Sequence, residues 1–60
     1  MLKLREKIED KTIQYFGFEH NSTLFIFKLL DEYEDNEHNN KCIEEILNSL
    51  IELEHYKNRF

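Results

Sequence analysis

Three histidines and one cysteine are the residues of this 60-residue chain best suited to metal chemistry. His38 and Cys42 are four positions apart, a spacing that places two zinc ligands on one face of a helix. His20 and His55 could complete a tetrahedral set. The paired Cys and His spacing of zinc modules is missing, however, and His38 falls in a polar segment typical of a loop. The sequence therefore predicts no metal site and no cofactor.

Carboxylates are abundant, but their spacing does not match two further kinds of metal site. The acidic segment 31–38 (DEYEDNEH) does not fit an EF-hand, since Tyr33 takes a ligand position in one register and Asn40 replaces the required glycine in the other. Glu52 and His55 match Glu-x-x-His, but di-iron carboxylate sites need two such motifs and two further glutamates. We expect these carboxylates to be solvated.

Nucleophilic catalysis is also disfavoured. The candidate nucleophiles Cys42, Ser22 and Ser49 would each need a base, an orienting group and an oxyanion site. The chain has a single glycine, which argues against a glycine-rich phosphate loop or a nucleophile elbow. Its length also leaves little room for a closed pocket. We predict that the protein is not an enzyme.

Hydrophobic spacing predicts that these residues are carried by helices. Leu4, Ile8 and Tyr15 belong to one helical stripe in a first helix, about 2–16. Gly17 follows it, and a glycine in the left-handed conformation with a hydrophobic residue next is typical of a Schellman-type helix end.

The second predicted helix, about 22–34, has N-cap candidates at Asn21, Ser22 and Thr23. Its apolar side chains cover most of the helix circumference. Two other short helices can hardly bury such a surface. We therefore expect part of it to contact a second copy or another protein.

The polar segment 34–40 predicts a loop, and Asn39 or Asn40 is suited to cap a third helix, about 41–57. The apolar seam of this helix, which we predict to serve self-association, consists of Ile43, Ile46, Leu50 and Leu53. The predicted fold class is all-α, with one small three-helix domain over 1–60. We expect it to oligomerise through its helices, most simply as a homodimer.

The alternative fold is α+β, with a hairpin at 12–29 followed by a C-terminal helix. Both runs, TIQYFGF and STLFIFKLL, are rich in β-forming residues. No Asn-Gly or Asp-Gly turn lies between them, and neither run alternates cleanly. The second run also continues into KLLDEYED, which has a helical pattern. These features favour the all-α fold.

Charge and composition limit the partners that we expect. Eight Lys and Arg residues against 13 Asp and Glu residues give a net charge of −5, which disfavours direct nucleic-acid binding. Apolar runs are too short for a membrane span and the N-terminus lacks an apolar signal region, so we expect a soluble, cytoplasmic protein without membrane contacts. The absence of Ala, Val, Pro and Trp is typical of an A+T-rich genome and suggests a phage or mobile-element origin.

The leading prediction of function is a small acidic, non-enzymatic regulator or inhibitor that binds another protein with a basic surface. The predicted interaction residues are aromatic anchors, one histidine and an acidic run, namely Phe18, His20, Phe25, Phe27, Asp31, Glu32, Glu34, Asp35 and Glu37. Two alternatives stay open. One is a self-associating structural or assembly protein, and the other, with less support, is a DNA-binding regulator.

Overall fold

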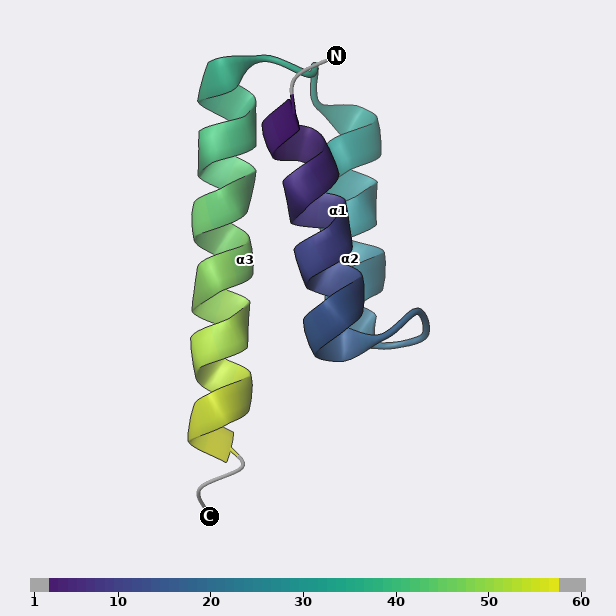
Figure 1. The fold of residues 1–60 in the computed structure, drawn as a ribbon, viewed down its shortest axis with the longest axis vertical. Coiled ribbons are helices and arrows are strands. Elements are labelled where there is room, and N and C mark those ends of the chain that lie inside the picture. The colour runs from purple at the N-terminus through teal and green to yellow at the C-terminus, as the bar shows by residue number, and fades with distance from the viewer. Residues whose placement is uncertain (1–2, 58–60) are drawn as a thin grey trace.

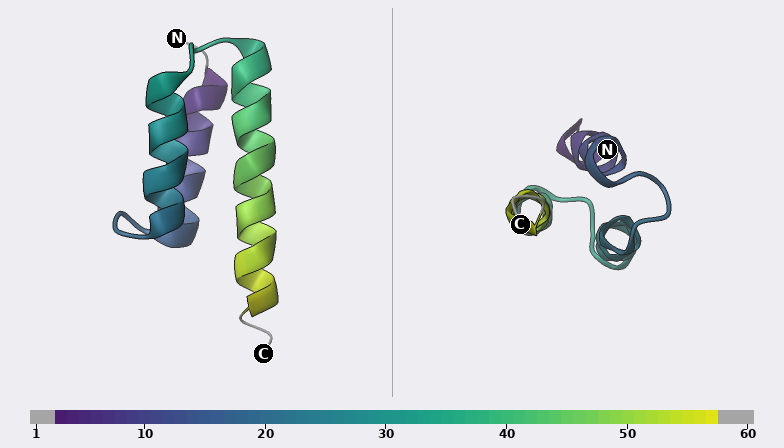
Figure 2. Two further views of the ribbon diagram at one scale, coloured as in Figure 1. Left: turned by 180° about the vertical axis from the view of Figure 1, so that it is seen from behind. Right: turned by 90° about the horizontal axis from the view of Figure 1, so that it is seen from below.

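The structure, a computed structural model, describes residues 3–57, which form three α-helices and no strand. The helices are α1 (Lys3–Phe16), α2 (Asn21–Glu32) and α3 (Glu37–Lys57). Successive helices run in opposite directions (Figure 1), and an end-on view shows them at the corners of a triangle (Figure 2). Each helix contacts the other two. The all-α prediction is confirmed, and the hairpin alternative at 12–29 is not supported. Leu2, in the predicted first helix, lies outside the described residues.

The chain leaves α1 through Gly17, as the sequence predicts. Gly17 has φ +84°, in the left-handed region that favours glycine. Its N–H donates to the carbonyl oxygen of Ile13 at 2.8 Å. This single bond defines the simpler αL helix end and not the Schellman form.

The N-cap of α2 differs from the three predicted candidates. His20 has extended backbone angles, and its Nδ1 accepts a hydrogen bond from the Ser22 N–H at 3.0 Å. Asn21, Ser22 and Thr23 all lie within the helix, so each was wrongly predicted as the cap. Thr23 is buried instead, and its hydroxyl donates to the Gly17 carbonyl at 2.6 Å, which fastens α2 to the preceding turn.

The third helix begins at Glu37, several residues earlier than predicted, and α2 ends at Glu32, slightly earlier than predicted. Asn36 is the N-cap of α3, since its side-chain Oδ1 accepts from the Asn39 N–H at 2.8 Å. Asn39 and Asn40 therefore lie within the first turns of α3, and their predicted capping role is wrong. Among residues 3–57, no helix combines the length and apolar character required to cross a membrane.

The buried hydrophobic core of the described residues is aliphatic. It consists of Ile8, Ile26, Leu30, Ile43 and Leu47. Leu4, Phe16, Leu29, Leu50 and Ile51 are partly buried around it. The buried side of α2 carries Thr23, Ile26 and Leu30, so the phenylalanines of that helix lie outside the core.

The side chain of Arg5 lies at the end of the bundle at which α2 ends and α3 begins. It donates to the backbone carbonyl oxygens of Leu30, Tyr33 and Glu34, the last two at 3.1 and 3.0 Å. The last carbonyls of a helix lack partners within the helix and carry partial negative charge, so a cation stabilises this end of α2.

Arg5 also reaches α3 and the loop before it. Its Nε donates to Asn40 Oδ1 at 3.0 Å and lies 3.5 Å from Asp35 Oδ1. Asn40 is fully buried and its Nδ2 donates to Asp35 Oδ1 at 2.8 Å. One side chain thus joins all three helices.

Candidate functional site

Several large hydrophobic side chains remain exposed on the described part of the bundle. These exposed residues are Tyr15, Phe18, Leu24, Phe25, Phe27, Tyr33, Ile46, Leu53 and Tyr56. Because exposed apolar area that one chain does not cover marks interaction sites, the pockets that some of these residues line between α1 and α2 and between α2 and α3 are candidate binding sites.

The first surface is a groove between α1 and α2, which we call the α1–α2 groove. It consists of two shallow pockets of about 430 and 340 Å³ that share Glu9 and Phe27. The first pocket is lined by Glu9, Asp10, Ile13, Gln14, Phe18 and Phe27, and the second by Arg5, Glu9, Phe27, Leu30 and Asp31. Phe18 is 77% exposed and Phe27 is 38% exposed.

Two features of the chain place these phenylalanines. Phe18 follows Gly17 in the turn between the helices, so neither helix covers it. Phe27 lies one position beyond buried Ile26, which turns it about 100° away from the core and towards α1. The result is an apolar floor made by two rings and by Ile13.

The rim of the α1–α2 groove is acidic. Glu9 and Asp10 come from α1 and Asp31 from α2. Arg5 also lines the groove, but its guanidinium is occupied by backbone carbonyls and by Asp35. On the other side of α1, Lys11 Nζ donates to Asn48 Oδ1 of α3 at 2.9 Å.

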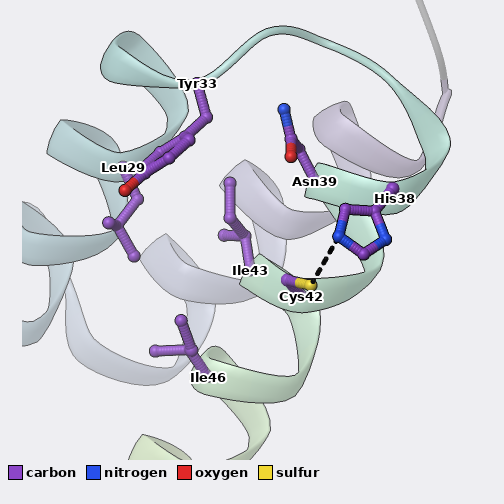
Figure 3. Close-up of a pocket in the computed structure, with 7 residues that line it drawn as sticks. All are labelled: Leu29, Tyr33, His38, Asn39, Cys42, Ile43 and Ile46. Atoms are coloured by element: carbon purple, nitrogen blue, oxygen red, sulfur yellow. Dashed lines mark hydrogen bonds between the residues drawn. The ribbon is translucent and has the colours of Figure 1, made fainter.

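The second surface, the α2–α3 face, lies on the other side of α2. A pocket of about 290 Å³ is lined there by Leu29, Tyr33, His38, Asn39, Cys42, Ile43 and Ile46 (Figure 3). Phe25 lies one turn before Leu29 on the same side of α2, and Leu53 lies two turns after Ile46 on the same side of α3. Ile46 is 37% exposed and Leu53 is 58% exposed.

The four candidate zinc ligands are not brought together. His38 Nε2 and Cys42 Sγ lie 3.9 Å apart in the pocket of Figure 3. His20 instead caps α2, with Nε2 at 3.8 Å from Glu54 Oε2, and His55 lies in the last turn of α3. Among the described residues, no three or more His, Cys, Asp or Glu side chains are arranged to hold a metal ion.

The predicted interaction residues separate into four groups. Phe18, Phe27 and Asp31 meet in the α1–α2 groove, whereas Phe25 lies on the opposite side of α2. Glu32 and Glu34 are exposed near the end of α2. The remaining residues serve the fold: His20 caps a helix, Asp35 pairs with Arg5, and Glu37 pairs with Lys41 at 3.3 Å.

The predicted self-association seam is divided between core and surface. Ile43 is buried in the core and Leu50 is partly buried against it. Ile46 and Leu53 are exposed on the α2–α3 face. A single chain therefore already uses half of this seam for its own folding.

Sequence reasoning missed the contribution of α1 to the groove. Arg5, Glu9 and Ile13 follow one another at intervals of four residues, so they share a helix face. That spacing could have shown that these three residues lie on one side of α1. It could not have shown that α2, rather than α3, lies beside them.

No protein-family model matches the chain, and comparisons with curated proteins and with solved structures also find no match. The functional argument therefore depends on the two surfaces themselves.

Proposed function

We propose that the protein is a small non-enzymatic regulator or inhibitor, which binds another protein through the α1–α2 groove and covers part of the partner's surface. The observation that carries this proposal is the exposure of Phe18 beside Phe27, outside an aliphatic core. Aromatic side chains that are exposed in the free protein and buried on binding are frequent anchors of protein interfaces.

The mechanism is occlusion. The phenylalanines and Ile13 supply apolar area that leaves water when the partner binds. The acidic rim of Glu9, Asp10 and Asp31 attracts a basic surface and raises the rate of encounter. Such a mechanism requires no reaction in the groove.

Affinity capture tests this function. We expect the immobilised chain to retain a partner from a lysate of the cells that produce it, and Phe18→Ala to reduce retention at least tenfold, as loss of an interface anchor does. Phe18 is 77% exposed, so its loss should leave the fold intact, which circular dichroism can verify. Phe25→Ala is the matched control, because Phe25 is exposed away from the groove. Equal retention by wild-type and Phe18→Ala chains would contradict the proposal.

A second candidate function is self-association through the α2–α3 face. The observation that favours it is the exposure of Ile46, which lines the pocket between these helices, and of Leu53 two turns further along α3. A homodimer joined on this face would cover apolar surface that the single chain leaves in water. Static light scattering at micromolar concentration distinguishes the monomer from the homodimer, since the monomer has a mass of 7.4 kDa and the homodimer twice that mass.

A further inference from the structure

The charge around the α1–α2 groove narrows the chemistry of its occupant. We propose that the groove binds a cationic amphipathic helix of a partner protein. Bulky apolar side chains of that helix would lie against Phe18 and Phe27, and its Lys or Arg side chains would lie over Glu9, Asp10 and Asp31. This inference rests on the proposed function, since it assumes that the groove binds protein.

The dimensions of the groove suit a short helix. It follows α1 from Arg5 through Glu9 to Ile13, and a helical rise of 1.5 Å per residue makes this path about 12 Å long. Phe27 lines both pockets and divides the path into two halves. Two apolar anchors one or two turns apart on a partner helix would occupy the two halves, which is the helix-in-groove mode of recognition.

The charges of the groove favour a cationic occupant. Arg5 is held by backbone carbonyls and Asp35, so it offers little attraction to an incoming anion. Lys11 lies on the side of α1 that contacts α3 and donates to Asn48. The carboxylates of Glu9, Asp10 and Asp31 would repel a negatively charged helix and form ion pairs with a positively charged one. A second copy of this chain, with net charge −5, is disfavoured for the same reason.

A pair of peptides tests the inference with the full-length protein. Both are 14-residue amphipathic helices with the same leucine face, and their polar face carries Lys in one and Glu in the other. We expect the Lys peptide to bind in calorimetry and to shift the backbone NMR signals of Glu9, Ile13 and Phe27. We expect the Glu peptide to bind at least tenfold more weakly, since it meets like charges.

Two double variants with the same change of net charge distinguish the effect of the groove carboxylates from the effect of the protein's overall charge. Glu9→Lys with Asp31→Lys should weaken binding of the Lys peptide about tenfold. Glu45→Lys with Glu52→Lys places the same charge change at exposed positions of α3, and should change affinity less than about threefold. Thermal unfolding of both variants verifies that the fold is kept.

Several results would overturn the inference. These are equal binding of the two peptides, equal weakening by the two double variants, and NMR shifts centred on Leu29 and Ile46. Concentration-dependent shifts in the groove of the free protein would show that a second copy occupies it. If capture of a partner depends on Phe18 but the Lys peptide does not bind, the proposed function stands and the cationic helix is wrong. If capture does not depend on Phe18, the proposed function itself fails.

Discussion

At the scale of single residues, Arg5 has the largest structural role. It is only 8% exposed, and it joins the end of α2, the following loop and the first turn of α3. Arginine suits this place because its planar guanidinium presents several donors in fixed directions, which a lysine cannot reproduce. Among residues 3–57, every buried side-chain nitrogen and oxygen has a hydrogen-bond partner. Loss of Arg5 would remove the side-chain donor to the carbonyl oxygens of Leu30 and Tyr33 and to Asn40 Oδ1.

Substitution of Arg5 should lower stability strongly. We expect Arg5→Met to reduce the free energy of unfolding by about 2–4 kcal/mol, because carbonyl oxygens and Asp35 lose a buried cationic partner. The free energy of unfolding of Arg5→Lys should lie between that of Arg5→Met and that of the wild type. Urea unfolding followed by circular dichroism measures both. Lys7→Met is the control, since Lys7 is exposed on the same helix. Equal stability of the Met variants would contradict this role for Arg5.

At the scale of elements, the two turns decide where α2 and α3 begin. Gly17 takes up the left-handed conformation that ends α1, and nothing lies within 4 Å of the position of an added Cβ. An alanine there would be strained by its backbone conformation and not by crowding. The start of α3 depends on Asn36, whose side chain accepts from the third residue of the helix. That start places Asn40 in the core.

Capping variants test the boundary of α3. We expect Asn36→Ala to lower the free energy of unfolding by about 1 kcal/mol, whereas Asn36→Asp should retain the cap. Asn39→Ala provides the comparison, because Asn39 is also a plausible cap in the sequence but lies inside the helix. Its side chain donates an exposed hydrogen bond to the carbonyl oxygen of Glu34. Chemical denaturation measures the free energy of unfolding of both variants. If Asn39→Ala lowered it more than Asn36→Ala, α3 would begin later, where the sequence predicted it.

At the scale of the whole molecule, a small aliphatic core leaves the aromatic side chains of α2 outside. Phe27 lies in the groove with α1, and Phe25 lies on the other side of α2. The α1–α2 groove and the α2–α3 face are therefore separate apolar surfaces. The acidic rim favours a basic partner for the α1–α2 groove, whereas the α2–α3 face is the proposed surface for a second copy.

Surface variants test which face self-associates. If the protein dimerises through the α2–α3 face, Ile46→Asp and Leu53→Asp should each return the mass measured by light scattering to 7.4 kDa, because a carboxylate would have to be buried in the dimer. Leu24→Asp adds the same charge at an exposed position of α2, and should leave the dimer unchanged. A wild-type chain that is monomeric at high micromolar concentration would exclude this mode of assembly.

Three features could be predicted without the structure, namely the three helices, the left-handed stop at Gly17 and the excess of apolar side chains on α2. Each of these follows from spacing along the chain or from the conformational freedom of one residue. The start of α3 depends on contacts between helices. Asn36, Asn39 and Asn40 are similar caps locally, and a helix that starts after Asn36 is the one that brings Asn40 to Arg5. The tertiary structure also decided that Phe27 meets α1 while Phe25 does not, since spacing separates the sides of a helix but does not say which neighbour covers each side.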